Sequence, residues 1–119
     1  MAREYLPQHA TEQSSFPVTI VMRDGAGALM TPNDDIVWSL CNGAGQIINS
    51  RLNVSYSPPS STVTVNLKGN DLLMENDRSQ AEERCLVVSC TFDSDLGADN
   101  PFVKGQWFWV EGVPVVTTT

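Results

Sequence analysis

The side chains that enzymes use most often for acid, base or nucleophilic chemistry are few and scattered in this chain. His9 is its only histidine, so one chain cannot assemble a Ser-His-Asp triad or a two-histidine zinc site. The adjacent acidic pairs Asp34-Asp35 and Glu82-Glu83 diverge on an extended backbone, which is the wrong geometry for an acid/base dyad. We therefore predict that the protein is not an enzyme and has no catalytic residue, and we assign no role to His9.

Two kinds of short motif could bind a ligand, but neither meets the chemical requirement. The run from Asp93 to Asn100 resembles a calcium loop in its spaced carboxylates, yet Gly97 stands at the third ligand position and no glutamate occupies the twelfth. The runs 25–27 and 43–45, both Gly-Ala-Gly, lack the Lys-Ser/Thr pair of a phosphate-binding loop. The sequence thus predicts no metal and no cofactor, and these glycines are interpreted as turn residues.

Aromatic side chains are the best candidates for contact with a partner. Trp107 and Trp109 fall on one face of a predicted strand and Phe108 on the other, so that one face packs in the core while the other can present apolar surface. The alternative is that both faces are core, as is common in small β domains. A second exposed aromatic is predicted beside a Pro-Pro pair, and the N-terminal segment carries two apolar residues. The candidate partner-binding residues are Tyr5, Leu6, Tyr56, Trp107 and Trp109.

The three cysteines, Cys41, Cys85 and Cys90, lie inside apolar runs and have no CxxC spacing. We expect them to be reduced and buried, each serving as a small apolar side chain. If Cys85 and Cys90 share a strand, their odd separation places them on opposite faces, where they cannot pair without a bulge. A pair between Cys41 and either of the other two stays geometrically open.

The charge balance excludes one large class of partner. Seven Lys and Arg against 14 Asp and Glu give a formal net charge of −7 and a pI of about 4.4, and such a surface repels phosphate backbones. No window approaches the 18 apolar residues of a membrane span, and the first nine residues contain no apolar signal segment. We predict no nucleic-acid partner, no membrane association and synthesis in the cytoplasm.

Alternation of apolar and polar residues with period two is the main structural signal along the chain. The strongest alternation predicts a central strand covered on both faces, and Asn42-Gly43 marks a hairpin turn into residues 46–49. Residues 72–84 are predicted to form one helical turn or a loop, and residues 93–101 a polar loop. The predicted strands cover residues 16–22, 36–41, 51–56, 62–67, 85–92 (the central one) and 106–111.

Short strands punctuated by Gly, Pro and Asn in a chain of 119 residues predict a single all-β domain. We expect an antiparallel two-sheet sandwich of the immunoglobulin-like kind, with Trp38 between the sheets. A jelly roll is the alternative if residues 28–30 form an eighth strand. The predicted organisation is an extended polar arm at 1–15, the sandwich at 16–116 and a short tail at 117–119. The arm either frays or becomes ordered on a partner.

The order of these segments carries a resemblance. A polar arm is followed by the strand Val18-Thr-Ile-Val-Met22, a Trp38 strand with Asn-Gly after it, the run Thr62-Val-Thr-Val-Asn-Leu, and Arg84-Cys-Leu-Val-Val-Ser-Cys-Thr-Phe. This pattern resembles the small β-sandwich accessory proteins of tailed-bacteriophage virions. The resemblance covers about residues 16–112 and includes no catalytic residue.

Several expectations follow from the resemblance. It implies a capsid decoration (cement) protein on the virion surface that binds major capsid protein subunits, bridges neighbouring subunits and stabilises the head. A homodimer or higher oligomer is possible, because edge strands need covering. Within the same group, an immunoglobulin-like module of the tail or neck is the alternative. A carbohydrate-binding adhesin domain, with Tyr56, Trp107 or Trp109 stacked on sugar, is the alternative from another class.

Overall fold

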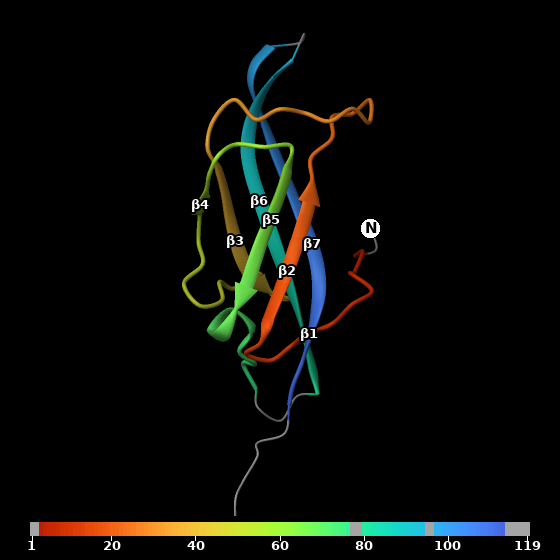
Figure 1. The fold of residues 1–119 in the computed structure, drawn as a ribbon, viewed down its shortest axis with the longest axis vertical. Helices are drawn as coiled ribbons and strands as arrows, with labels where there is room; N and C mark the ends of the chain where they lie inside the picture. The colour runs from red at the N-terminus through yellow and green to blue at the C-terminus, as the bar shows by residue number, and fades with distance from the viewer. Residues whose placement is uncertain (1–2, 77–79, 95–96, 114–119) are drawn as a thin grey trace, which may run out of the picture.

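The computed structural model describes residues 3–76, 80–94 and 97–113. This part of the chain is all-β, as predicted, with one short 3₁₀ helix (Figure 1). Five strands form one sheet in the order β1-β7-β6-β3-β4, and two strands form a second sheet, β2-β5. The elements are β1 (Ala10–Thr11), β2 (Ser15–Val21), β3 (Ile36–Asn42), β4 (Val54–Tyr56), β5 (Thr62–Lys68), η1 (Gly69–Leu72), β6 (Ala81–Ser94) and β7 (Gly97–Glu111).

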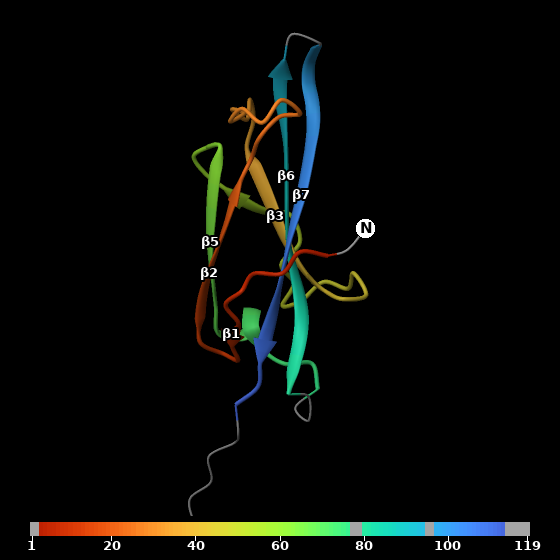
Figure 2. The same ribbon diagram turned by 90° about the vertical axis from the view of Figure 1, so that its right-hand side faces the viewer.

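The period-two alternation places one face of each sheet in a common core. In β5 every second residue is buried while Thr62, Thr64, Asn66 and Lys68 are exposed. Figure 2 shows β2 and β5 in one layer and β3, β6 and β7 in another. The buried apolar side chains of both layers belong to one cluster, which includes Val18, Ile20, Trp38, Leu40, Val63, Val65, Leu67, Leu86, Val88 and Phe108.

The predicted strand 85–92 is central, as expected, because β6 lies between β3 and β7. Its inward side chains Leu86 and Val88 are fully buried. On the opposite face Val87 and Ser89 are only half-buried, so the prediction that both faces are covered is wrong along this part of the strand. The reason is that the second sheet, β2-β5, packs on one face alone.

The prediction for residues 72–84 is wrong in its boundaries. The helical turn, η1, comes earlier, over Gly69–Leu72, where the Asp71 carboxylate accepts the backbone N–H of Lys68 and Leu72 is fully buried. Strand β6 begins at Ala81, four residues before the predicted start. Residues 82–84, near the start of β6, are charged, and hydrogen bonds rather than apolar packing hold them in the strand, as described below.

The predicted polar loop 93–101 is instead the end of a long hairpin, because β6 runs to Ser94 and β7 begins at Gly97. Side-chain hydrogen bonds replace apolar contacts in this part. The Asn100 amide donates to the carbonyl oxygens of Gly97 and Phe92, at 2.9 and 3.2 Å. Asn33 donates to the carboxylates of Asp93 and Asp99.

One further expectation is wrong. The predicted strand 51–56 is shortened to β4, because Asn53 adopts a positive φ of 51° that an extended strand does not tolerate. Residues 28–30, the eighth strand of the jelly-roll alternative, form no strand, and Leu29 makes only an isolated bridge to Arg23. The predicted boundary between the domain and the tail, at 116 and 117, lies outside the described residues. Within the described part of the chain, no helix has the length and apolar character to cross a bilayer.

Candidate functional site

The N-terminal arm lies along β7 of its own chain. The Leu6 N–H donates to the Trp107 carbonyl at 3.0 Å, and the Glu12 N–H donates to the Glu111 carbonyl at 2.8 Å. Between these points β1 pairs with β7 in parallel, with Ala10 opposite Val110. Ala10 is 1% exposed. The arm therefore acts as an extra strand on the outer edge of β7 and contributes a side chain to the core.

The arm also covers the two tryptophans that project from the outer face of β7. The Tyr5 ring stacks on Trp109, with centroids 5.3 Å apart and planes 16° from parallel. The Arg3 guanidinium lies 3.8 Å from the centroid of the Trp107 ring, a cation–π distance. Arg3 Nη1 donates to the Glu83 carboxylate at 2.8 Å, and the Tyr5 hydroxyl donates to the same carboxylate. We call these five residues the arm–tryptophan face.

The ionisable groups of the arm–tryptophan face favour the docked arm near neutral pH. The hydrogen bond from the Tyr5 hydroxyl, partly opposed by burial and reinforced by Arg3, lowers the pKa of Glu83. The hydrogen bond to Glu83, with burial, raises the pKa of Tyr5. Both shifts favour a charged Glu83 accepting from a neutral tyrosine.

Four of the five predicted partner-binding residues lie together at the outer edge of β7. Tyr5, Trp107 and Trp109 are on the outer face, whereas Leu6, next along the arm, packs against the core. Tyr56 is elsewhere, in β4, where it packs against the core and its hydroxyl accepts the Thr64 N–H at 3.3 Å. Phe108 is fully buried and contacts Phe16 at 5.3 Å between ring centroids, which confirms that one face of this strand is core.

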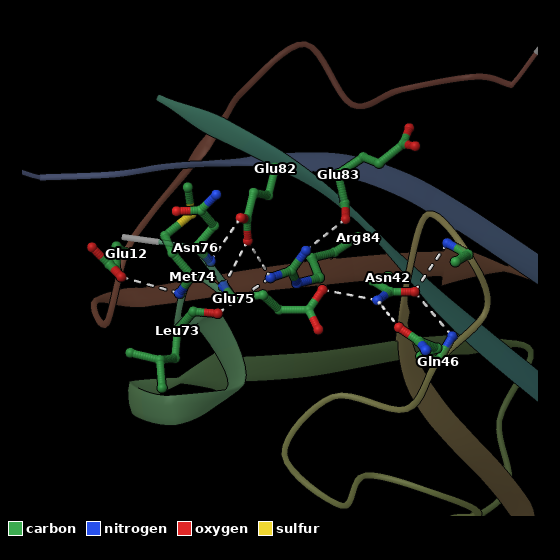
Figure 3. A network of polar contacts seen from close by, with 11 residues as sticks. Glu12, Asn42, Gln46, Leu73, Met74, Glu75, Asn76, Glu82, Glu83 and Arg84 are labelled. Atoms are coloured by element: carbon green, nitrogen blue, oxygen red, sulfur yellow. Dashed lines mark hydrogen bonds and ion pairs between the residues drawn. The ribbon is translucent and has the colours of Figure 1, made fainter. Parts of the chain in front are cut away.

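Below the arm–tryptophan face lies a network of polar contacts around the buried side chain of Arg84 (Figure 3). The side chain is 1% exposed, and its Nη2 donates to Glu82 Oε1 at 2.8 Å and to the Leu73 carbonyl at 3.2 Å. Nη1 donates to the Glu83 carbonyl at 2.8 Å. Nε finds no hydrogen-bond partner among the described residues. The guanidinium ties the start of β6 to the segment that follows η1.

Asn42 extends this network to the end of β3. Its amide nitrogen donates to Glu75 Oε1 at 2.8 Å and to Gln46 Oε1 at 3.0 Å, and its oxygen accepts the N–H groups of Ala44 and Gln46. An open pocket of about 420 Å³ lies beside the network, lined by Asn42, Glu75, Glu82, Glu83, Arg84 and Trp109 among others. The three glutamates that line it already accept hydrogen bonds from neighbouring groups. These bonds connect β6 to the N-terminal arm through Glu83, and the segment after η1 to the end of β3 through Glu75.

Sequence reasoning missed Arg3, Glu83 and Arg84. One signal for Arg84 was present, because extending the alternation of Leu86 and Val88 towards the N-terminus places residue 84 on the inward face. A charge at an inward position of a strand predicts a paired, buried group. No comparable signal exists for Arg3, since its contact with Trp107 joins residues 104 positions apart.

The residues of the rejected calcium motif are placed only in part, since Asp95 and Leu96 lie outside the described residues. The Asp93 carboxylate accepts from the Asn33 amide at 2.6 Å and from the Asp99 N–H at 3.0 Å. His9 Nδ1 lies 2.6 Å from a carboxylate oxygen of Glu111. Across residues 3–76, 80–94 and 97–113, no three His, Cys, Asp or Glu side chains gather as metal ligands.

All three cysteines are free thiols. Cys85 and Cys90 are buried, as predicted, while Cys41 is half-buried. Cys90 faces the core, where its sulfur lies 3.7 Å from that of Met22. Cys85 is on the other face of β6, opposite Cys41 of β3. The expected placement of Cys85 and Cys90 on opposite faces is confirmed.

No protein-family model matches the chain, and searches of curated proteins and of solved structures found no match.

Proposed function

We propose that the two sheets form an immunoglobulin-like sandwich of the variable type. The order β7-β6-β3-β4 corresponds to strands G-F-C-C′ and the pair β2-β5 to strands B-E. Trp38 then occupies the strand C position that carries the core tryptophan of antibody domains. The Cys90–Met22 sulfur contact falls where those domains join strands B and F by a disulfide. The absence of a strand at 28–30 among the described residues weighs against the jelly-roll alternative.

On this fold we propose that the protein is a non-enzymatic virion structural protein that binds the outside of a phage capsid and bridges neighbouring shell subunits. The observation that carries the proposal is the projecting hairpin (Figure 1). Strands β6 and β7 have 14 and 15 residues, against 7 in β2, β3 and β5. At about 3.3 Å per residue they are roughly 45–50 Å long, twice the length of their neighbours.

The projecting hairpin gives the molecule two candidate contact surfaces. Its distal part is solvent-exposed at Asp99, Pro101 and Val103, and Val103 is 66% exposed. The arm–tryptophan face lies further along the same strand, about 26 Å away from Asp99 to Trp107 at the usual rise per residue. Two separated surfaces on one rigid strand are what a protein needs to touch two shell subunits at once, and many such weak contacts stabilise a shell by multivalency.

The alternative location in a tail or neck would use the same surfaces and differs only in the partner. The adhesin alternative has less support. A sugar stacks on an uncovered aromatic ring, whereas Trp107 and Trp109 are already in contact with Arg3 and Tyr5. The Tyr56 ring packs against the core.

The test uses heads from a deletion mutant of the phage that encodes the chain. We expect the full chain to co-sediment with these heads and to raise the temperature at which they release DNA. Two variants probe the two surfaces: one in which Asn-Gly replaces residues 93–99, and Arg3→Ala with Tyr5→Ala. Asn66→Ala, on the exposed face of β5, is the matched control and should bind normally.

The proposal is supported if either variant no longer raises the temperature of DNA release while its circular dichroism spectrum is unchanged. Co-sedimentation with tails but not heads would move the protein to the tail or neck. No binding of the full chain to either would overturn the virion proposal.

A further inference from the structure

A row of four residues crosses the outer face of the five-stranded sheet. Cys41 of β3 is directly opposite Cys85 of β6, Cys85 is opposite Trp107 of β7, and Trp107 bridges to Tyr5 of the arm. Two free thiols are therefore side by side on adjacent strands, at one end of the row. The connection between β3 and β6 runs through 38 intervening residues, 43–80.

The hydrogen-bond pattern of β3 fixes which kind of cross-strand pair the cysteines form. On the side away from β6, the Asn42 N–H donates to Gln46 and the Leu40 carbonyl accepts from Ile48. Residues 40 and 42 thus direct their backbone groups away from β6, and Cys41, between them, directs its groups towards Cys85. The cysteines form a hydrogen-bonded pair, for which the Cα separation is about 5.5 Å. That value lies inside the disulfide range of about 4.4–6.8 Å.

The two thiols differ in access. Cys85 is 3% exposed, whereas Cys41 is half-buried and within reach of a small reagent. Burial raises the pKa of both thiols, that of Cys85 to about 12, and the neighbouring Cys41 contributes to the rise at Cys85. Cys90 has no such neighbour, because it faces the core beside Met22. The difference in access sets the order of reaction, Cys41 first and Cys85 second, and the raised pKa values slow both steps because the thiolate is the attacking form.

We propose that Cys41 and Cys85 are a reversible disulfide site that is oxidised by low-molecular-weight disulfides such as glutathione disulfide. The Cys41 thiolate attacks one sulfur of glutathione disulfide and releases one glutathione, leaving a mixed disulfide on Cys41. The Cys85 thiolate then attacks the Cys41 sulfur and releases the second glutathione. The two protein thiols lose two electrons and two protons, and one glutathione disulfide becomes two glutathione molecules.

The register also predicts that this bond is easily reduced. Directly opposite residues have Cβ atoms about 4.5–5.5 Å apart, with hydrogen-bonded pairs at the upper end. A disulfide needs about 3.5–4.5 Å. The two Cβ atoms must approach by about 1 Å, and strained disulfides have higher reduction potentials than structural ones. The site is therefore suited to switching between two states rather than to permanent cross-linking.

The experiment treats the reduced full chain with glutathione disulfide and measures intact mass, the number of alkylatable thiols and the linked peptides. Cys41→Ala and Cys85→Ala remove the site, and Cys90→Ala is the matched control. We expect the natural chain to lose two hydrogens and two of its three alkylatable thiols, with the peptides of Cys41 and Cys85 joined. Cys90→Ala should also lose two hydrogens and should keep no alkylatable thiol. Added reduced glutathione should restore the thiols in both proteins.

The proposal is overturned if the natural chain keeps three alkylatable thiols, if a glutathione adduct persists on Cys41, or if the linked peptide contains Cys90. A bond that reduced glutathione does not reverse would overturn the inferred lability. Circular dichroism of Cys41→Ala and Cys85→Ala establishes that the loss of oxidation does not come from unfolding. None of these readouts depends on capsid binding.

Discussion

Arg84 is the largest fully buried side chain in the described part of the chain, and it is charged. Burial of an ion is tolerated only where partners replace its water, here Glu82 and two backbone carbonyls. We expect Arg84→Ala to lower the free energy of unfolding by about 3–5 kcal/mol, because the part-buried Glu82 carboxylate loses its cationic partner and the two carbonyls lose a donor. Urea denaturation measures this value.

The control for that prediction is Arg23→Ala, since the exposed Arg23 side chain donates, among the residues placed by the structure, to the Gly27 carbonyl alone. Its effect should stay within about 0.5 kcal/mol. If Arg84→Ala lowers the free energy of unfolding by less than about 1 kcal/mol, the ion pair and hydrogen bonds of the guanidinium contribute no net stability.

Asp71 links stability to pH. Burial alone would raise its pKa, but hydrogen bonds from Arg51, Asn49 and the Lys68 N–H together lower it below the ordinary value of 3.8. The charged carboxylate therefore stabilises the fold fully above that value, and the contribution is lost as pH falls through the lowered pKa. We expect the stability difference between the natural chain and Asp71→Asn to be largest near neutral pH and to shrink below pH 3.8.

Urea midpoints measured across the acid range test this expectation. Asn66→Ala should give a difference from the natural chain that does not vary with pH. A constant difference for Asp71→Asn would show that Asp71 has the same pKa in the folded and unfolded states.

At the residue scale, the sequence could predict which side chains are core wherever apolar residues alternate. Val63, Val65 and Leu67 of β5 follow this rule, and all three are buried. Buried polar residues do not follow it. Arg84 and Asp71 lie in the interior because partners distant in sequence satisfy them, and single-residue hydrophobicity contains no information about those partners.

Among the elements, the arm is the one whose contacts are expected to depend most on pH. Its side chains converge on the Glu83 carboxylate, whose pKa lies below the ordinary value of 4.5. The docked arm is thus favoured above that value and loses the contribution as pH falls through the lowered pKa. We expect tryptophan fluorescence to become more accessible to acrylamide as the pH falls below 4.5 at moderate salt.

Glu83→Gln is the variant that isolates this effect, because it keeps the shape of the side chain and cannot titrate. Its acrylamide quenching should be raised at neutral pH and nearly independent of pH. If the natural chain and Glu83→Gln have parallel pH profiles, the arm is held by its backbone pairing with β7 and not by Glu83.

Elements with strong alternation were predicted well, and those held by polar side chains were not. Strands β2, β3 and β5 lie where the pattern placed them. The sequence of the distal part of the β6–β7 hairpin, residues 93–101, indicates a loop, because Asp93, Asp99 and Asn100 are turn-forming residues in most contexts. Here the Asp93 carboxylate accepts the Asp99 N–H and the Asn100 amide donates to the Phe92 carbonyl across the hairpin. Such cross-strand partners become visible only once the register is known.

At the scale of the whole molecule, stability is expected to reside in the two-layer core and not in the distal hairpin. A variant in which Asn-Gly replaces residues 93–99 closes on the opposed pair Phe92 and Asn100 with a favoured two-residue turn. Because the removed described side chains are exposed, the free energy of unfolding should change by less than about 1 kcal/mol. A larger loss would show that the hairpin is part of the cooperative core.

The pairing of sheets could be predicted only in outline. Local alternation indicates strands and turns, and hence an all-β chain, but the order of strands depends on contacts between distant residues. The parallel pairing of β1 with β7 is such a case, since Ala10 and Val110 are 100 residues apart. Tyr5, Trp107 and Trp109 were named individually from the sequence, and their convergence on the outer face follows from the arm's pairing with β7, which turns Leu6 towards the core.

The same pairing has a consequence for the order of events during synthesis. The arm leaves the ribosome roughly 100 residues before its partner strand is made, so Tyr5 and Leu6 have no docking surface during most of translation. The outer edge of β7 closes only after β7 has emerged. A nascent chain halted before Trp107 would therefore carry an undocked arm. In a series of ribosome-bound chains of increasing length, the length at which the arm becomes resistant to protease would show when it docks on β7.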